Sequence, residues 1–210
     1  MGSTPSHSDD HQRTRLSGED RRASIIAAAR PVFAHHGFHG TSTAEIAAAA
    51  TCSEPTLYKH FDSKAALFAA VLVDASAEMK RRVAAALDGA DDRFAAFIGL
   101  MRDVLAEPGF AELVRLRSLA MTMVDDPLVH EALRQGVEGQ QRTVAAAVRS
   151  AQERGSVRTD VDAEAIGWIA VGFSLVSSFR NAIDGPAGLA GMASTLDTLE
   201  RLLTTREGSG

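Results

Sequence analysis

The sequence has one cysteine, few aromatic residues and no long hydrophobic run, and each scarcity excludes a class of protein. With Cys52 alone, no disulfide can form within the chain. Aromatic residues make up 5% of the chain, and no segment alternates apolar and polar residues as a half-buried strand does, so we expect no strands. The longest nearly apolar run, residues 165–179, contains serines and is shorter than the roughly 18 residues of a membrane span, so no membrane association is predicted.

The charge and the N-terminus narrow the class further. Residues 1–12 are polar and lack the apolar stretch of a secretory signal, so we expect a cytoplasmic protein. The formal net charge is -5, which on its own argues against a nucleic-acid partner. The charge is uneven, however: residues 13–64 contain seven Lys and Arg against five Asp and Glu, whereas residues 65–210 contain fifteen against twenty. A small DNA-binding module joined to a larger acidic body has this distribution.

Helical periodicity is present along almost the whole chain. Residues 1–18 have little to bury and are predicted to be a disordered arm. The remainder predicts an all-α fold of about nine helices. They are expected at 19–37, 42–50, 53–61, 63–87, 91–107, 110–125, 127–154, 162–184 and 189–205.

Two of these helices are short and close together, which predicts a helix-turn-helix. Ser42 followed three residues later by Glu45 is a capping-box pattern, so a helix begins there. Ser53 can cap the next helix, because Pro55 falls in an early position that tolerates proline. The second helix would be one to two turns long and would show a polar outer face to a major groove wide enough to admit it.

The residues of this motif resemble the DNA-binding domain of the TetR (tetracycline-repressor-like) family almost position by position over residues 19–72. The most specific block is residues 56–64, Thr-Leu-Tyr-Lys-His-Phe-Asp-Ser-Lys. The resemblance implies a disordered arm (1–18), a three-helix DNA-binding domain (19–72) and a larger effector-binding and dimerisation domain (73–210). It also implies a sequence-specific transcriptional regulator, a homodimeric repressor released from operator DNA by a small apolar effector, with no enzymatic activity and no cofactor.

The same resemblance assigns DNA contacts by position. Ser42 and Thr43 match the start of the supporting helix, where a hydroxyl and the helix N-terminus meet phosphate. Glu54 and Pro55 match positions that tune sequence preference, and Lys64 matches a backbone contact. The complete set of expected DNA-binding residues is Ser42, Thr43, Ser53, Glu54, Pro55, Thr56, Tyr58, Lys59, His60 and Lys64.

The larger domain offers bulky apolar side chains for an effector pocket. Most of them are expected to be ordinary core, and family architecture implies that some line a cavity. The candidates are Phe94, Phe97, Met101, Phe110, Met121, Trp168 and Phe173, with Arg115, Arg117 and His130 as possible polar anchors. The nearly all-apolar helix around residues 166–179 and the leucine stripe from Leu189 to Leu203 predict a four-helix interface across a two-fold axis.

Two positions depart from the family pattern. Thr51 stands at the turn where the family usually has glycine, so the turn either avoids positive φ or is strained. Pro31 lies inside the first helix, where it removes a backbone N–H and is expected to kink or weaken the helix.

The remaining features each allow a structural and a functional interpretation. His35, His36 and His39 have no partner at metal-ligand spacing, so no metal site is predicted, and Cys52 is expected to be inert rather than a redox sensor. Arginines 13, 15, 21 and 22 would either be solvated or bind DNA as a basic arm. A helical enzyme is disfavoured because no nucleophile–base pair or phosphate loop is present. A protein-interaction module with a purely structural helix-turn-helix is disfavoured by the expected exposure of Thr56, Lys59, His60 and Lys64.

Overall fold

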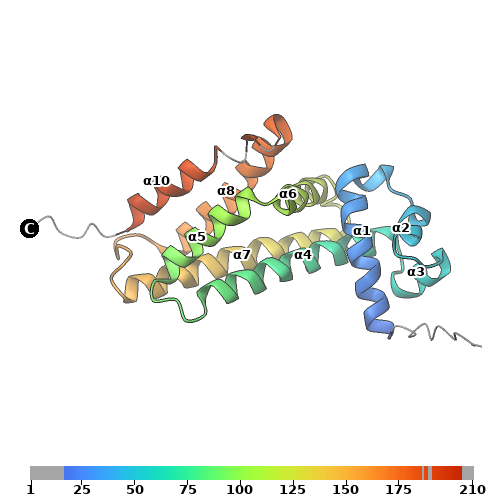
Figure 1. Ribbon diagram of the computed structural model, residues 1–210, viewed down its shortest axis with the longest axis horizontal. Coiled ribbons are helices and arrows are strands. Elements are labelled where there is room, and N and C mark those ends of the chain that lie inside the picture. The colour runs from blue at the N-terminus through green and yellow to red at the C-terminus, as the bar shows by residue number, and fades with distance from the viewer. Residues whose placement is uncertain (1–16, 186, 189–190, 205–210) are drawn as a thin grey trace, which may run out of the picture.

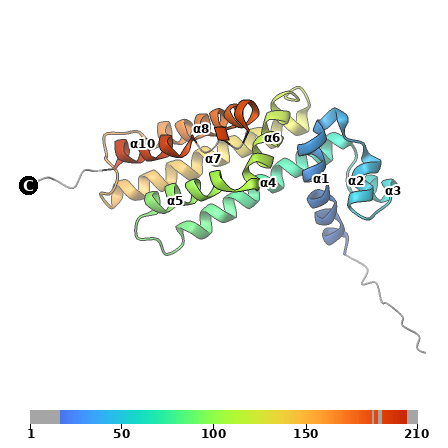
Figure 2. The same cartoon turned by 45° about the horizontal axis from the view of Figure 1, so that its top comes forward.

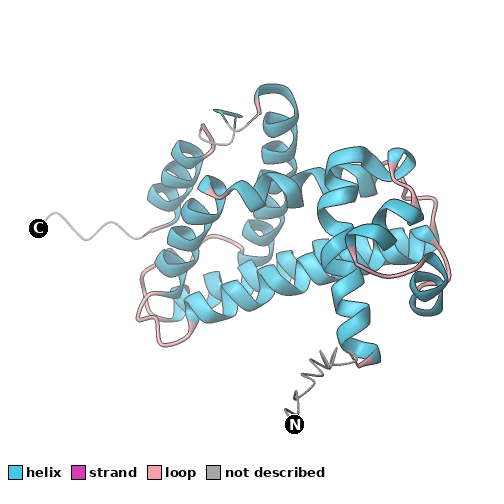
Figure 3. Ribbon diagram, turned by 45° about the vertical axis from the view of Figure 1, so that its right-hand side comes forward, coloured by secondary structure: helices cyan, strands magenta, loops and turns pink. Residues whose placement is uncertain are grey.

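The chain folds as an elongated bundle of helices (Figures 1 and 3). The computed structural model describes residues 17–185, 187–188 and 191–204, and within this range the expected all-α fold with nine helices is confirmed. The helices are α1 (Gly18–Gly40), α2 (Thr43–Ala49), α3 (Glu54–His60), α4 (Lys64–Leu87), α5 (Arg93–Ala106), α6 (Pro108–Met121), α7 (Pro127–Glu153), α8 (Ala163–Asp184) and α10 (Ala193–Leu203). Most of the predicted disordered arm lies outside the described residues.

Two regions lie at opposite ends of the long axis (Figure 1). The head (residues 17–72) holds α1, α2, α3 and the first turns of α4, and the body (residues 73–204) holds the rest. The long helices α4 and α7 pack along each other, and α4 joins the two regions as one continuous helix. Viewed after rotation, α8 and α10 lie over one side of α7 while α5 lies between α10 and α4 (Figure 2).

Side-chain caps determine where the helices of the head begin. Ser17, Ser42, Ser53 and Ser63 each accept a hydrogen bond from the backbone N–H three residues later, at 3.1, 3.1, 3.3 and 3.0 Å. Each bond satisfies a donor that the first turn of a helix would leave unpaired. The predicted caps at Ser42 and Ser53 are therefore confirmed.

The centre of the head is aromatic and aliphatic. The ring of Phe33 lies edge-on to that of Phe68, with centroids 5.0 Å apart, and Phe38 lies 5.7 Å from Phe68. Ile25, Ile46 and other buried aliphatic side chains surround these rings. The cluster continues into α6 and α7, so the head is anchored on the near end of the body. Phe61 is buried in this cluster, whereas Tyr58 is about half exposed.

Several element boundaries differ from the predictions. The interruption of α1 falls at Gly37, which has φ +72° as expected for a glycine stop, while Pro31 lies within the helix without a local break. α6 begins at Pro108 rather than Phe110, because proline is tolerated at the first helical position. α10 begins at Ala193, and Leu189, the first residue of the predicted stripe, lies outside the described residues.

The leucine stripe of α10 faces inward, which corrects the prediction that it forms an intersubunit surface. Met192, Leu196 and Leu203 are buried in the second core cluster, in which Phe94, Phe97 and Ile98 of α5 also lie. Arg102 of α5 fixes this pairing through ion pairs to Asp197 and Glu200, at 2.8 and 2.5 Å. The stripe is therefore used for packing within the chain.

α8 differs from the other helices because much of its apolar surface has no partner in the chain. It packs along α7, where Gly167 lets the two helices approach closely. Its other side leaves large apolar side chains exposed: Trp168, Ile169, Leu175, Val176, Phe179 and Ile183. By length and composition alone α8 is also the one helix among the described residues that could cross a membrane, which was not expected and is weak evidence for a single helix of a bundle.

Candidate nucleic-acid interface and body cavity

The helix pair α2 and α3 stands at the outer end of the head. Ile46 of α2 and Leu57 of α3 are fully buried between the helices and α1, so their positions are fixed by the core. The intervening turn contains Thr51 at φ +51°, the one non-glycine residue with positive φ in the described part of the chain. Of the two alternatives expected here, the turn does not avoid positive φ, so it is strained, because a β-branched side chain is disfavoured in the left-handed region.

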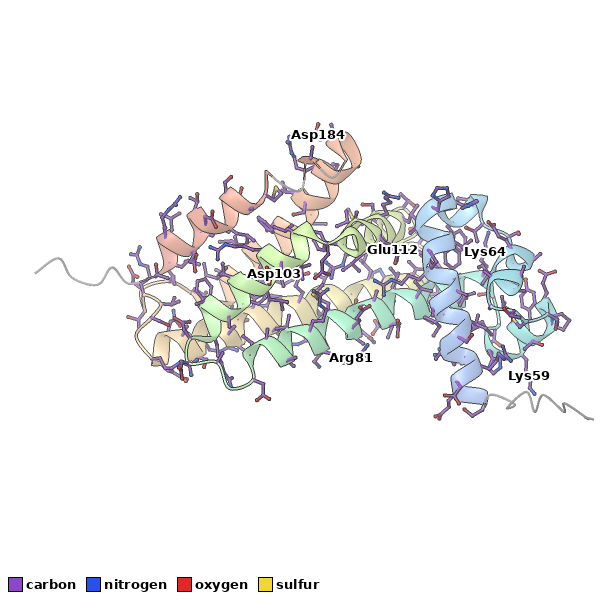
Figure 4. The ribbon with its side chains drawn as sticks, viewed as in Figure 1. Lys59, Lys64, Arg81, Asp103, Glu112 and Asp184 are labelled. Atoms are coloured by element: carbon purple, nitrogen blue, oxygen red, sulfur yellow. The ribbon has the colours of Figure 1, made fainter. Side chains whose placement is uncertain are left out.

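The opposite side of α3 faces solvent. Lys59 projects from the tip of the head, away from every other element (Figure 4). Of the ten residues expected to contact DNA, six are exposed and four are half-buried. The exposed ones are Ser42, Ser53, Glu54, Pro55, Tyr58 and Lys59, and the half-buried ones are Thr43, Thr56, His60 and Lys64.

Hydrogen bonds hold this surface in one arrangement. Thr43 at the start of α2 donates from Oγ1 to Glu54 Oε1 at 2.5 Å, and its hydroxyl lies 3.4 Å from that of Tyr58. Ser53 and Thr56 share a hydroxyl contact of 2.9 Å at the start of α3. The polar groups of the two helices thus form one continuous surface, in which Glu54 is oriented by its neighbour rather than freely rotating.

Lys64 has a structural role in addition to the one expected for it. Its ammonium donates to the carbonyl oxygens of Phe38 and Thr41, both at 2.8 Å, and lies 4.5 Å from the centre of the Phe38 ring. It lies inside the head, between the end of α1 and the start of α4 (Figure 4). A substitution at Lys64 would therefore disturb the fold, and Lys59 is the cleaner probe of this surface.

The basic residues before this surface are only partly described. Arg13 and Arg15 lie outside the described residues, and the guanidinium of Arg22 lies 4.9 Å from the centre of the Phe61 ring. Arg22 is therefore held against the head by a cation–π contact. The described residues contain no group of three or more His, Cys, Asp or Glu that could hold a metal ion.

The body contains a cavity of about 380 Å³ between α4, α5, α6, α7 and α8. Its volume falls within the range of small-molecule sites. The lining is mostly apolar, with Phe97, Met101, Phe110 and Leu113 among the larger side chains. A second, much smaller pocket also has Arg117 in its lining, together with Leu72 of the head's core cluster and Leu133, which packs against that cluster.

Three of the seven predicted lining residues, Phe97, Met101 and Phe110, do line the cavity, as does Arg117 among the anchors. The other four predicted residues lie on faces of their helices that do not line the cavity. Phe94 is buried and Phe173 half-buried in the second core cluster, while Met121 and Trp168 are exposed. Arg115 and His130 are exposed and stand outside the lining, so neither is an anchor in this structure.

Sequence reasoning missed the contribution of α4 and α7. Val73, Met79 and Lys80 of α4 line the cavity, as do Gly139 and Gln140 of α7. A Cβ atom added at Gly139 would meet nothing within 4 Å, so this glycine leaves open space in a helix interior. Glycines that interrupt an otherwise good helix-forming sequence were the available signal.

An ion-pair group connects the cavity walls to the head. Arg30 of α1 donates to Glu78 of α4 at 2.5 Å and to Glu112 of α6 at 2.6 Å. Burial disfavours the charge of Arg30, but the hydrogen bonds and charges of the two carboxylates raise its pKa above the ordinary value. In Figure 4, Glu112 lies where α6 meets α1. The two helices that carry these carboxylates also line the cavity, so head and cavity are mechanically linked.

Comparison with known proteins decides the family. Residues 25–71, which span the helix-turn-helix, match the bacterial regulatory proteins of the tetR family. The chain carries the DNA-binding domain of the TetR family. It is therefore a DNA-binding regulator of transcription, as the sequence predicted, and its relatives are regulators rather than enzymes.

Individual relatives show how the similarity is distributed along the regulator. The transcriptional activator FasR of Mycolicibacterium smegmatis is 45% identical over 58 residues, which cover 28% of this chain and only 26% of FasR. A TetR-family regulator from Pectobacterium atrosepticum is 29% identical with a TM-score of 0.70, covering 92% of this chain and 99% of its own. A regulator from Saccharomonospora viridis, solved in complex with choline, shares the fold at 21% identity and a TM-score of 0.77, covering 90% of this chain and 100% of its own.

Proposed function

We propose that this regulator is a cytoplasmic homodimeric repressor, and that a small effector in the body cavity releases it from operator DNA. The observation that carries the proposal is the polar outer surface of α2 and α3, held by internal hydrogen bonds at one end of a body with a cavity. Head and cavity share α4 and α6, so occupation of one can alter the other.

The DNA contacts follow from the exposure of the α3 face. Lys59, exposed at the tip, would neutralise a backbone phosphate. Glu54 and Pro55 at the start of α3 would meet base edges, where a carboxylate accepts from cytosine and a pyrrolidine ring packs on a thymine methyl. The start of α2, with Ser42 and Thr43, would receive a phosphate at a helix N-terminus.

The exposed apolar side of α8 is the proposed dimer interface. Trp168, Leu175 and Phe179 recur at intervals of seven and four residues and therefore share one side of the helix. Gly172 lies between them, and a Cβ atom added there would meet nothing within 4 Å, so a second helix could approach. A two-fold axis at this surface would place two heads on one side of duplex DNA, about 34 Å apart or slightly more.

Effector release would use the linkage through Arg30. A ligand that separates α4 from α6 would pull Glu78 and Glu112 apart, and Arg30 with the rest of α1 would move with them. Changing the separation of the two heads weakens binding to fixed half-sites, provided that the ligand binds the released state more tightly. The Saccharomonospora viridis relative, solved in complex with choline, supports the idea that proteins of this fold bind small organic molecules.

Repression is proposed in preference to activation, although FasR is an activator. The similarity to FasR lies in 58 residues, and a DNA-binding head by itself determines where a regulator binds rather than its effect on transcription. Occupation of a promoter by a dimer is sufficient to exclude polymerase, whereas activation requires a further surface. A reporter gene under the selected operator should increase in expression when the regulator is deleted, and a decrease would favour activation.

Lys59→Ala tests the DNA-binding surface. A duplex selected by the intact regulator from a randomised pool provides the probe, and affinity is measured over a range of salt concentrations. Loss of one phosphate contact should reduce the slope of log K against log salt by about one, equally for cognate and non-cognate duplexes. Arg81→Ala, at an exposed cation on the body, is the matched control (Figure 4). Equal slopes in all three proteins would remove α3 from the interface.

Phe179→Asp tests the interface. Phe179 is 65% exposed, so the isolated chain tolerates the charge, but a charge buried between two subunits is costly. Sedimentation should change from dimer to monomer, and operator affinity should fall with it. Leu128→Asp, at a residue 51% exposed on α7, should leave the dimer intact. A Phe179→Asp protein that remains dimeric would place the interface elsewhere.

A further inference from the structure

The residues that line the cavity carry positive charge, although the body as a whole is acidic. Three basic residues, Lys80, Arg117 and Arg142, belong to the cavity lining, and among the described residues the lining contains no Asp or Glu. Arg142 is already paired with Glu138 at 3.3 Å, and Lys80 is exposed, so only Arg117 brings an unpaired, desolvated charge to the cavity. A cationic ligand such as choline would meet no opposite charge here.

Arg117 is placed for binding rather than for packing. It extends from α6, and among the described residues its guanidinium is bonded to Gln140 Oε1 at 3.1 Å and forms no ion pair. The half-buried arginines Arg30, Arg82 and Arg102 each bind carboxylates instead. Burial lowers the pKa of Arg117, but a guanidinium remains charged at neutral pH. A desolvated cation without a counter-charge is costly, and an anion in the cavity would remove that cost.

Gln140 determines how Arg117 faces the cavity. Its Nε2 donates to the carbonyl oxygen of Ala170 at 3.2 Å and contacts the Ser174 hydroxyl at 2.6 Å. The amide oxygen of Gln140 therefore points toward Arg117 and accepts from Nη1. One of five guanidinium N–H groups is used by this bond, and the others remain for a planar, two-oxygen acceptor.

We propose that the effector is an amphipathic monocarboxylate, whose carboxylate forms a paired hydrogen bond with Arg117 and whose apolar part lies against Phe97, Met101 and Phe110. One guanidinium matches one carboxylate in charge and geometry, whereas a phosphate dianion would require a second buried cation. This assignment rests on the proposed effector function of the cavity and narrows its ligand from apolar to acidic. Arg117 lies five residues after Glu112 on α6, so the bound anion acts on the helix that holds Arg30.

Binding is tested on the full-length regulator with alkyl and aryl carboxylates, such as octanoate and phenylbutyrate. The matched neutral and cationic probes are octanol and octylamine. Calorimetry should detect the acids and give little or no binding of the alcohol and the amine. Equal affinity for all three head groups, or no binding by any acid across a range of chain lengths, would overturn the proposal.

Arg117→Met supplies the second readout. It keeps an unbranched side chain, shorter than that of arginine, and removes the charge. It should weaken carboxylate binding by about ten- to a hundredfold while leaving the weak binding of octanol unchanged. It should also raise the melting temperature of the unliganded protein, whereas loss of an arginine that stabilises the fold would lower that temperature. Arg115→Met, an exposed arginine on the same helix, is the control and should change neither quantity. Unchanged carboxylate affinity in Arg117→Met would overturn the proposal.

Failure of the ligand class is distinguishable from failure of the proposed function. Operator binding of the wild-type protein is measured with and without saturating carboxylate. Binding of the acid without release of DNA would leave the ligand assignment standing and refute effector-driven release. Release of DNA by a ligand whose binding does not require Arg117 would support effector-driven release and refute the carboxylate assignment. Should Arg117→Met fold poorly, the comparison of acid, alcohol and amine on the wild-type chain still decides the ligand class.

Discussion

In the head, serine caps begin four successive helices and three phenylalanine rings meet at the centre, whereas in the body five helices surround a cavity of about 380 Å³. The body also leaves one side of α8 exposed and places beside the cavity an arginine, Arg117, that forms no ion pair among the described residues. Among the described residues of the head, Tyr58 on the face of α3 is the one large apolar side chain that is exposed. The body leaves several groups unsatisfied, and each of them indicates a missing partner.

This contrast agrees with the functions proposed for the two regions, which are DNA binding for the head and a response to a ligand for the body. A surface that reads DNA must keep its side chains within fractions of an ångström, which a closely packed core provides. A region that responds to a ligand must have two arrangements of similar free energy, and incomplete packing makes that possible. The link between them is narrow, since α4 and α6 carry the carboxylates that Arg30 binds.

Matched truncations in the two regions should give the largest difference. Phe68→Ala in the head removes a fully buried ring that contacts two others, and should cost about 3–5 kcal/mol of unfolding free energy. Phe97→Ala in the body removes a ring that borders the cavity and lacks neighbours on that side, and should cost only about 1–3 kcal/mol. Urea unfolding at one fixed protein concentration measures both, because the proposed dimerisation would make stability concentration-dependent.

Equal costs at Phe68 and Phe97 would mean that the cavity is closed by collapse in solution. The ring of Phe97 would then have neighbours on every side, and the distinction between a filled head and an open body would be lost. Addition of a ligand that fills the cavity should in any case stabilise the wild type more than the Phe97→Ala protein.

Two glycines inside body helices should respond with opposite signs to the same substitution. At Gly167 of α8 an added Cβ would lie 2.6 Å from the backbone oxygen of Gln141, which cannot move without separating α7 from α8. Gly167→Ala should therefore destabilise the regulator by about 1–3 kcal/mol. At Gly139 of α7 the added Cβ meets open space, so Gly139→Ala should stabilise by about 0.5–1 kcal/mol through helix propensity. A loss of stability at Gly139 would mean that the cavity wall is already filled at that point.

Much of the head could be predicted from the sequence because its determinants are local. Ser42, Ser53 and Ser63 cap helices within three residues of themselves, and the break at Gly37 needs only the glycine. The polar face of α3 follows from the spacing of the polar residues within that helix. The second role of Lys64 was missed because its partners, Phe38 and Thr41, lie more than twenty residues away in the chain.

The sequence predicted the helices of the body but not most of the residues that line its cavity. Its helices were placed to within a few residues, yet Trp168 and Met121 were expected in the cavity and are exposed. Which face of a helix meets a cavity depends on how helices pack, and bulky apolar residues occur on every face of a helix such as α8. The stripe on α10 was assigned to a second subunit because periodicity indicates a buried face without identifying what buries it.

A comparably small effect is expected at the one strained residue of the otherwise well-packed head. Thr51 has φ +51° in the turn between α2 and α3, where its N–H donates to Ala48 and that of Cys52 donates to Ala47. These bonds end α2 and require the left-handed conformation, which glycine adopts without strain. Thr51→Gly should therefore stabilise the regulator by about 1 kcal/mol, after the greater flexibility of glycine in the unfolded chain is subtracted.

Thr51→Val is the matched control, because valine keeps the branched Cβ that causes the strain and removes only the exposed hydroxyl. Its unfolding free energy should stay close to that of the wild type. DNA affinity should be unchanged in both variants, since Thr51 lies on the turn rather than on the outer face of α3. A Thr51→Gly protein that is less stable but binds DNA equally well would show that the turn stores no strain. A loss of affinity alone would instead mean that threonine holds α3 at the angle that DNA requires.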